Sequence, residues 1–377
     1  SSLLHSASSS SHHKKMSNSP TSSADLCRGV NAPSPPSLIA ERGAGSTLIL
    51  DGGMGHELRR RGVTIKGPVG SQERFLGVAL ANTEQPSVVR AAHSAFIEAG
   101  AGAIITNNYA CVPATIGSDV VPHITAAGKV ARESVGSSKA LVLGSLPPLK
   151  ATYRPDLVSP ESEMARDYTT IAGAIAPHSD VLVCETMSRA DEAAAACKAA
   201  LETGKKVWVS WTLSEEADGT LISGETIEEA VAALPTLDGV DALLFNCSSI
   251  EAVDAGLPRL RACIPDRIKI GAYANGFHTV KSEGTDSAAG ALSDKEGEKA
   301  APSEYRKDLT PEAYAQAGAG WVKKHGACIV GGCCGIFPEH IKALSDLINK
   351  MEVEGVEGYG GESEVAERPA KLARRQQ

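Results

Sequence analysis

Two adjacent cysteines near the end of the chain, Cys333 and Cys334, are the residues whose chemistry the sequence marks most clearly. Neighbouring residues of a strand point to opposite faces, so two adjacent thiols address one centre only where the backbone turns. The surrounding Gly331, Gly332 and Gly335 permit such a turn. A metal ion is the natural centre for two thiolates, although a vicinal disulfide or a pair of packing thiols is the simpler alternative.

Cys247 is the candidate third ligand, because it directly follows another short apolar run. Taken alone, it reads as a small buried hydrophobic residue. Together with Cys333 and Cys334 it forms a soft set of three thiolates that suits zinc and leaves a fourth position open. The other six cysteines stand in no such context, namely Cys27, Cys111, Cys184, Cys197, Cys263 and Cys328.

The three-sulfur set indicates what the metal would do. Three thiolates leave a zinc(II) ion with about one net negative charge, which weakens it as a Lewis acid toward water. None of the ten histidines has the HExxH or HxH spacing of hydrolase ligands. The pattern therefore favours activation of a thiol substrate for attack on carbon. A zinc hydrolase and a protein with a purely structural zinc site are the alternatives.

Eight short, mostly continuous apolar segments predict strands that are covered on both faces. Helical patterns separate most of them, among them 86–99, 161–176, 188–203, 227–234 and 311–324. This alternation predicts an α/β protein with a single (β/α)8 TIM barrel, and a doubly wound open sheet is the competing architecture. The predicted strands are 47–50, 103–106, 140–144, 180–184, 206–212, 241–246, 268–273 and 327–331.

A barrel places its chemistry just past the carboxyl ends of the strands. Polar residues follow several of the predicted strands: Asp51 the first, Thr106 the second, Glu185 the fourth and Asn275 the seventh. We therefore expect these side chains to meet the cysteines at one mouth.

Composition limits the classes of protein to consider. The 377 residues are 42% hydrophobic, and 37 Lys and Arg against 45 Asp and Glu give a formal net charge of -8. With no dense basic stripe, no nucleic-acid partner is expected. No apolar run approaches the roughly 20 residues of a membrane-spanning helix. Nine irregularly spaced cysteines indicate reduced thiols, so we expect a cytoplasmic protein.

The ends of the chain differ from its middle. Residues 1–45 are rich in Ser, Pro and Ala and predict a disordered leader with a weak likeness to an organellar transit peptide. Residues 46–350 form the predicted barrel, and 351–377 a polar tail. Residues 281–307, between the last two strands, predict a mobile loop beside the mouth. The sequence does not define an oligomeric state, and a monomer is consistent with it.

In order along the chain, these motifs resemble the homocysteine S-methyltransferase family over about residues 47–348. The likeness is carried by Asp51-Gly52-Gly53-Met54-Gly55, Thr106-Asn107, Glu185-Thr186, Asn246-Cys247 and Gly331-Gly332-Cys333-Cys334-Gly335. Members of this family are zinc-dependent (β/α)8 barrels that transfer a methyl group to homocysteine to make methionine. The resemblance thus implies the same fold and the same thiol chemistry.

Carried onto this chain, the resemblance makes Cys247, Cys333 and Cys334 the zinc ligands. It assigns Asp51 and Glu185 as the catalytic acidic residues that hold the amino acid substrate. Glu185 would pair with the substrate ammonium, and Asp51 would orient it or receive the thiol proton. Further substrate-binding candidates are Gly52 and Thr106, and Asn275 near the metal.

The implied reaction is an in-line displacement from a cationic methyl donor. A sulfonium, S-methylmethionine, is the first candidate and betaine the second. Family members often carry Thr where this chain has His56 and, in many S-methylmethionine users, Arg where it has Gly335, so the donor stays open. Four aromatic residues could contact a cationic donor, namely Tyr109, Trp211, Tyr273 and Phe277.

Overall fold

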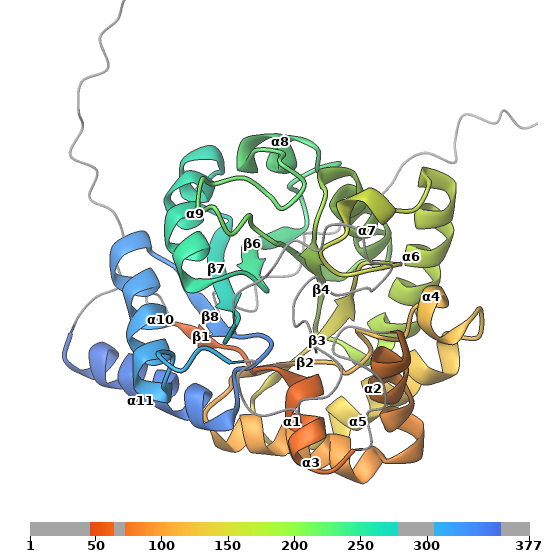
Figure 1. Ribbon diagram of the computed structural model, residues 1–377, viewed down its shortest axis with the longest axis horizontal. Coiled ribbons are helices and arrows are strands. Elements are labelled where there is room, and N and C mark those ends of the chain that lie inside the picture. The colour runs from red at the N-terminus through yellow and green to blue at the C-terminus, as the bar shows by residue number, and fades with distance from the viewer. Residues whose placement is uncertain (1–45, 64–71, 278–304, 356–377) are drawn as a thin grey trace, which may run out of the picture. The chain divides into compact units, whose positions relative to one another are not determined.

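Eight parallel strands form one sheet that closes on itself, with helices on its outside (Figure 1). Neighbouring strands pair in the order β1-β8-β7-β6-β5-β4-β3-β2, and a parallel bridge between Leu50 and Ala103 joins the end of β1 to β2. The predicted (β/α)8 barrel is confirmed. The open-sheet alternative is wrong, because the first strand pairs with the last along Leu48 to Ile329. The strands are β1 (Leu48–Ile49), β2 (Ala103–Ile105), β3 (Leu141–Leu146), β4 (Val181–Met187), β5 (Lys206–Trp211), β6 (Val240–Asn246), β7 (Lys269–Ala274) and β8 (Ile329–Gly332).

The computed structural model describes residues 46–63, 72–277 and 305–355, all within one compact unit. The predicted leader, most of the predicted 281–307 loop and nearly all of the predicted tail lie outside these residues. The helices are α1 (Met54–Arg60), α2 (Gln72–Glu84), α3 (Pro86–Glu98), α4 (Pro113–Ile116), α5 (Val121–Val135), α6 (Glu161–Ile175), α7 (Ala190–Glu202), α8 (Ile227–Ala232), α9 (Ile250–Cys263), α10 (Pro311–His325) and α11 (Pro338–Val353), with 3-10 turns η2 (Pro155–Leu157) and η3 (Ala176–His178).

The strands are apolar on both faces because each face meets its own core. Along β4, Val181 and Val183 belong to the barrel interior, whereas Leu182 and Cys184 pack in the layer beneath the helices. This alternation follows from the two-residue period of a strand. Every strand contributes to the interior, which Trp208 of β5 helps to fill. The continuous apolar runs of the sequence are therefore the mark of a doubly covered sheet.

Two strands, β3 and β4, continue by two or more residues past their predicted ends, and the difference matters for the site. β3 and β4 continue to Leu146 and Met187, so Ser145 and Glu185 lie within strands and not after them. At the other end, α11 continues to Val353, and the predicted boundary at 350 falls inside this helix. The buried side chain of Met351 explains that extension.

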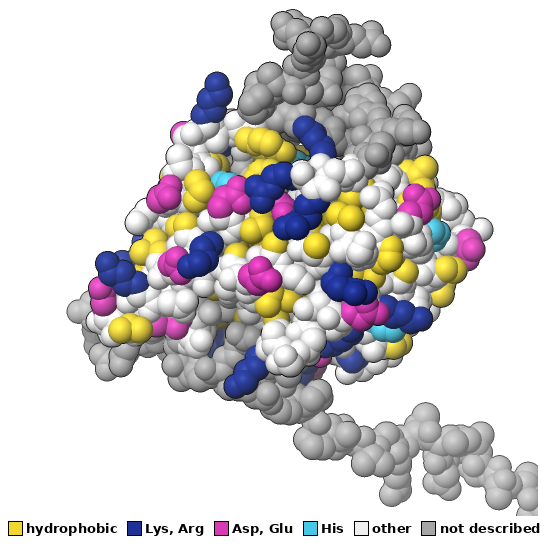
Figure 2. All heavy atoms as spheres, turned by 90° about the horizontal axis from the view of Figure 1, so that it is seen from below, with side chains coloured by type: hydrophobic (Ala, Val, Ile, Leu, Met, Phe, Trp, Pro, Cys, Tyr) yellow, Lys and Arg dark blue, Asp and Glu magenta, His cyan; other side chains and the backbone are white. Residues whose placement is uncertain are grey.

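Acidic and basic side chains are interspersed on the face drawn in Figure 2, without a block of one sign. Ion pairs among the described residues include Arg60 with Glu339 at 2.6 Å and Arg132 with Asp180 at 2.7 Å. Across the described part of the chain, every helix is too short or too polar to cross a bilayer.

Candidate active site

A cavity of about 190 Å³ opens at the carboxyl ends of the strands. Its walls come from the segment after β1, from the ends of β2, β4, β6, β7 and β8, and from the loop after β3. Seven of the eight predicted site residues line it, namely Asp51, Gly52, Thr106, Glu185, Cys247, Cys333 and Cys334. The topology of the barrel thus gathers residues that lie up to 283 positions apart, as Asp51 and Cys334 do.

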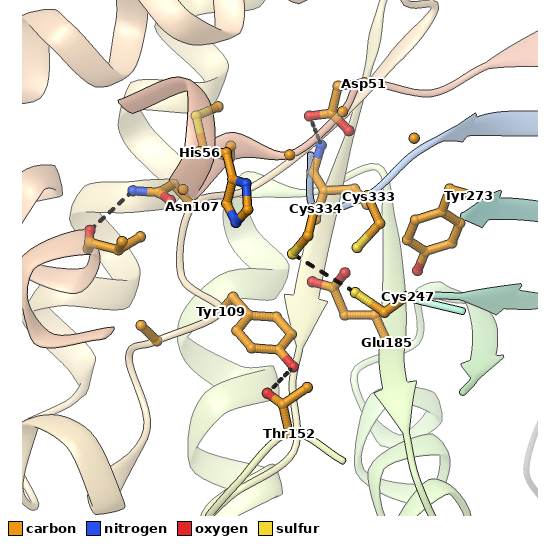
Figure 3. A pocket seen from close by; sticks show the side chains of 18 of the residues that line it. Asp51, His56, Asn107, Tyr109, Thr152, Glu185, Cys247, Tyr273, Cys333 and Cys334 are labelled. Carbon is orange, nitrogen blue, oxygen red and sulfur yellow. Dashed lines mark hydrogen bonds between the residues drawn. The ribbon is translucent and has the colours of Figure 1, made fainter. Parts of the chain in front are cut away.

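The three predicted ligand thiols meet on one side of the cavity. Figure 3 shows their sulfur atoms turned toward one another. All three sulfurs lie within 4.8 Å of one another, and the Cys247 and Cys334 sulfurs are 4.0 Å apart. Among the described residues, no other group of His, Cys, Asp and Glu side chains is gathered closely enough to hold a metal ion.

Backbone turns aim these thiols at one point. Cys247 follows β6 with a left-handed φ of 51°, and its N–H donates to the carbonyl of Tyr273 at 3.2 Å. After β8, the Cys333 N–H donates to the carbonyl of Ala274 at 2.9 Å, and the turn ends at Gly335 with φ 79°. Because left-handed backbone is costly for a residue with a side chain, the conformation of Cys247 marks a strained position that its surroundings enforce.

The protonation of the cluster supports a cation-binding role. Hydrogen bonds from Cys333 and Cys334 hold the pKa of the Cys247 thiol well below its usual range. Hydrogen bonding to Cys247 in turn raises the pKa of Cys333 and of Cys334 above the usual value. One of the three neighbouring thiols is therefore favoured as a thiolate and the other two as thiols, and a positive charge among them would favour ionisation of all three. A soft divalent cation such as zinc fits this donor set, because thiolates are its preferred ligands.

Glu185 projects into the cavity from an irregularity in β4. The pairing of β4 with β5 shifts register between Cys184 and Met187, and a bulge of this kind re-aims a side chain. The carboxylate accepts a hydrogen bond from the hydroxyl of Ser145. Burial raises the pKa of Glu185 to about 8, despite that hydrogen bond, and the nearby Cys247 raises it further. A cationic ligand would favour the ionised carboxylate here.

Asn246 ties this bulge to the sulfur cluster. Its Oδ1 accepts from the Thr186 N–H at 2.8 Å and from the Ser210 hydroxyl at 2.7 Å. Its Nδ2 donates to the Thr186 hydroxyl at 2.8 Å and lies 4.0 Å from the Cys333 sulfur. Thr186 itself adopts a left-handed φ of 58°. The predicted Asn-Cys motif thus supplies one ligand and one residue that supports the site.

Asp51 is buried in the cavity wall directly after β1. Its Oδ2 accepts a hydrogen bond from the N–H of Ile105, the last residue of β2, at 2.9 Å. Burial raises its pKa well above the ordinary value. The neighbouring Gly52 is required by packing, since a Cβ there would lie 2.4 Å from the carbonyl oxygen of Ile336. One Asp51 oxygen therefore has a structural role in addition to any contact with a ligand.

The side chains of Thr106 and Asn275 form hydrogen bonds to other residues around the cavity. The Thr106 hydroxyl donates to Asn108 Oδ1 at 2.5 Å and accepts from the Ser145 N–H at 3.0 Å. Asn275, predicted to bind substrate, is fully buried and is not among the residues that line the cavity. Its Nδ2 donates to the Tyr153 hydroxyl at 3.2 Å, so it meets the cavity only through that tyrosine.

Aromatic side chains form much of the remaining wall. Tyr109, Tyr273 and Phe277 line the cavity as expected, and Tyr109 shares a 2.8 Å hydrogen bond with Thr152. The expectation for Trp211 is wrong: its side chain packs in the layer between barrel and helices, because it alternates with the inward-facing residues of β5.

Sequence reasoning missed three residues at this site. Ser145 stands in an apolar run, and a polar residue there was a usable signal. His56 follows the Asp-Gly-Gly segment, and its Nδ1 lies 2.9 Å from the hydroxyl of Tyr305, 249 positions away. No local sequence pattern predicts that pair, since Tyr305 lies within the predicted loop 281–307.

Comparison with known proteins identifies the family to which the chain is similar. A model of the family described as homocysteine S-methyltransferase matches residues 48–348. Homocysteine S-methyltransferase of Escherichia coli (strain K12) is 27% identical over 319 residues, which cover 79% of this chain and 94% of that protein. S-methylmethionine–homocysteine S-methyltransferase BHMT2 of Rattus norvegicus is 26% identical over 322 residues, covering 82% and 80%.

A longer relative matches with only part of its length. Methionine synthase of Mycobacterium tuberculosis (strain ATCC 25618 / H37Rv) is 29% identical over 326 residues, or 81% of this chain and 25% of that protein. The chain thus spans about a quarter of the mycobacterial methionine synthases it matches. Among solved structures, the metallated form of homocysteine methyltransferase MmuM from Escherichia coli has the same fold, with a TM-score of 0.61, 24% identity and coverage of 80% and 96%.

Proposed function

The chain belongs to the homocysteine S-methyltransferase family, and we propose that it is a methyltransferase that moves a methyl group from a cationic donor to the thiol of homocysteine, with zinc as its metal and S-methylmethionine as its donor. One observation carries this proposal. Three thiols within 4.8 Å of one another line the same cavity as the buried carboxylates of Asp51 and Glu185. A thiol amino acid offers a sulfur to the first group and an ammonium to the second.

Cys247, Cys333 and Cys334 would hold the zinc ion. When bound there, zinc supplies positive charge that favours the ionised form of a substrate thiol. The same three-sulfur set argues against water activation, since hydrolytic zinc sites use neutral or mixed ligands. Among the described residues that line the cavity, only one histidine, His56, is present.

The two carboxylates would bind the amino acid part of homocysteine. Glu185, with a pKa of about 8 in the free protein, would be driven to its ionised form by the substrate ammonium. Ser145 would keep that carboxylate oriented through its hydrogen bond. Asp51, tied by one oxygen to the Ile105 N–H, would orient the substrate or receive the thiol proton.

The transfer itself would be a single displacement. The homocysteine sulfur attacks the donor methyl carbon, a new sulfur–carbon bond forms, and the electron pair of the broken bond leaves with the donor sulfur. Both products are then methionine, and no covalent bond to the protein is needed. The enzyme contributes chiefly by holding the two sulfur atoms in line within a closed cavity.

A sulfonium donor suits the aromatic walls of the cavity. The cavity is lined by Tyr109, Tyr273 and Phe277, and aromatic rings attract cations. Betaine, a quaternary ammonium, is the second candidate on the same ground. The rat relative named for S-methylmethionine supports the first choice.

The test is methionine formation from homocysteine by zinc-loaded protein, with S-methylmethionine, betaine and S-adenosylmethionine supplied separately. We expect product with S-methylmethionine, its loss after chelation and its return when zinc is restored. Product with betaine alone would correct the donor and leave the acceptor in place. No product with any donor, from folded and zinc-replete protein, would overturn the proposal.

A further inference from the structure

The sulfur cluster concentrates negative charge where a further anion has to bind. Under the proposed function, on which this inference rests, three thiolates and the homocysteine thiolate would surround one zinc(II) ion and leave about two net negative charges at the site. Such a site needs hydrogen-bond donors close to its sulfurs, because buried charge without partners is costly. The described residues that line the cavity include no Lys or Arg. The donors must therefore come from neutral side chains.

Two neutral side chains approach the sulfur atoms. The first is Asn246, whose Nδ2 lies 4.0 Å from the Cys333 sulfur. The second is Tyr153, which lines the cavity from the loop after β3. It packs in one buried cluster with Cys247, and Cys333 and Cys334 pack against that cluster. Tyr153 thus adjoins all three predicted ligands.

The loop that carries Tyr153 is tied down on both sides of this residue. Before it, the Thr152 hydroxyl shares the 2.8 Å hydrogen bond with Tyr109. After it, the Pro155 carbonyl accepts from Arg189 Nη1 at 3.1 Å. Tyr153 itself has a left-handed φ of 61°, which is costly for a residue with a side chain. The fold therefore holds this tyrosine in an unfavourable conformation that brings it to the sulfur cluster.

Asn275 fixes the hydroxyl of Tyr153. Its Nδ2 donates to that hydroxyl at 3.2 Å, and this is the one hydrogen bond of the Asn275 side chain within the described structure, because the buried Oδ1 has no partner. An amide buried with an unpaired oxygen costs stability, and an apolar side chain would avoid that cost. The contribution of this amide is therefore its contact with the tyrosine.

The polarity of that hydrogen bond decides where the tyrosine directs its own hydrogen. A tyrosine hydroxyl has one hydrogen to donate, and accepting from Asn275 leaves that hydrogen available to a second partner. The Cys247 sulfur is such a partner: its pKa is lowered first by hydrogen bonds from Cys333 and Cys334, and then by one from Tyr153. Asn275, Tyr153 and Cys247 therefore form a relay of hydrogen bonds that ends on a sulfur of the cluster.

We propose that Tyr153, held by Asn275, is a positioning residue of the metal site whose hydroxyl donates to the Cys247 sulfur and withdraws part of its negative charge. A ligand sulfur that shares its charge with a donor gives less of it to the metal, so the homocysteine thiolate would bind more readily at the open position. The same hydrogen bond fixes the direction of the Cys247 side chain, as the outer partners of metal ligands commonly do.

The test replaces zinc with cobalt(II), whose sulfur-to-metal charge-transfer band reports the charge on the ligand sulfurs. Tyr153→Phe keeps the ring and removes only the hydroxyl. In cobalt-loaded protein without substrate, we expect this variant to move the band to lower energy, because a sulfur without the hydrogen bond gives up an electron more easily. In competition with a chelator, its zinc Kd should rise roughly 10- to 100-fold, the usual effect of losing an outer partner of a metal ligand.

Asn275→Ala tests the relay. Without the amide the tyrosine hydroxyl can turn away from the sulfur, so the band should move in the same direction by less, and the zinc Kd should rise by a smaller factor. The double variant should be no weaker in zinc binding than Tyr153→Phe alone, since both changes act on one interaction. A shift to higher energy in Asn275→Ala would show that the amide takes the tyrosine hydrogen, and it would overturn the inference.

Tyr168→Phe is the matched control. This tyrosine is also buried, and its hydroxyl donates to the Pro147 carbonyl of the same loop at 3.1 Å, but it lies outside the cluster packed around Cys247. It should move neither the band nor the zinc Kd. An unchanged band in Tyr153→Phe, or an equal shift in Tyr168→Phe, would overturn the inference. Failure of the proposed function would show instead as absent methionine formation while the band shift of Tyr153→Phe persists.

Discussion

Asn246 holds Thr186 through both atoms of its amide: Oδ1 accepts from the threonine N–H and Nδ2 donates to its hydroxyl, each at 2.8 Å. The two residues are 60 positions apart and end or interrupt different strands, β6 and β4. This contact keeps Thr186 in left-handed backbone and so fixes the direction in which Glu185 points.

Asn246→Ala should therefore lower both stability and activity. The substitution leaves the buried Thr186 N–H without its partner, and we expect the free energy of unfolding to fall by about 2 to 4 kcal/mol. Urea denaturation measures the loss. Asn349→Ala, at an exposed residue of α11 whose amide makes one 3.3 Å hydrogen bond, is the control and should cost far less. Equal losses in the two variants would contradict the role given to Asn246.

Removal of one cysteine of the cluster should release the metal. In Cys333→Ser we expect zinc content per protein to fall severalfold and methyl transfer to be lost, because a hydroxyl is a poor substitute for a thiolate ligand. Cys328→Ser is the matched control: this thiol precedes β8 on the same segment but lies outside the cluster. Elemental analysis after dialysis compares the two. Full zinc retention by Cys333→Ser would exclude Cys333 as a ligand.

Replacement of Glu185 should act on one substrate only. Glu185→Gln keeps the size of the side chain and removes the charge, so we expect the homocysteine KM to rise roughly 10- to 100-fold. With 4-mercaptobutanoate, which lacks the ammonium, wild type and variant should have similar KM values. Ser145→Ala, which removes the hydroxyl that donates to this carboxylate, should have a smaller effect. An unchanged homocysteine KM in Glu185→Gln would remove Glu185 from the binding site.

His93 should make the protein less stable in acid. Burial in α3 lowers its pKa to about 3, from an ordinary value of 6.5, and neither ring nitrogen has a hydrogen-bond partner in the described structure. Between these values the unfolded chain binds a proton that the folded chain does not, so stability falls as pH falls below 6.5. The loss reaches about 2 kcal/mol by pH 5.

His93→Leu removes this titration and sacrifices no hydrogen bond. We expect the variant to be at least as stable as the wild type at pH 7 and to lose less stability on acidification, measured by denaturation at pH 7 and pH 5. Parallel acid losses in both proteins would show that His93 is accessible to protons in the folded state.

The barrel and the gathering of the three cysteines could be predicted from the sequence because both leave local patterns in it. Apolar runs such as 206–212 predict β5 to within one residue, and Cys333-Cys334 between glycines predicts a turn that presents two thiols. Cys247 joined them by analogy of position at a strand end, and the structure brings its sulfur to 4.0 Å from that of Cys334.

Contacts between distant segments escaped prediction. The bulge in β4 depends on Asn246, and nothing near Glu185 in sequence shows it. The pairing of His56 with Tyr305 joins the first turn of α1 to a residue 249 positions later. Asn275 lies at a strand end, as predicted, but its amide donates to the Tyr153 hydroxyl and does not line the cavity. Side-chain direction at a strand end follows from backbone detail that residue spacing does not encode.

The separation of the cluster along the chain has a consequence for how the protein is made. Cys247 leaves the ribosome well before Cys333 and Cys334, and the latter reach it only after β8 pairs with β1 and β7. A growing chain therefore carries a single thiol where the finished protein carries three, and it cannot retain zinc by this site. Under the proposed function, the zinc site is complete only when the barrel closes, so zinc binding and closure would be linked, and zinc supply would raise the yield of folded protein as well as its activity.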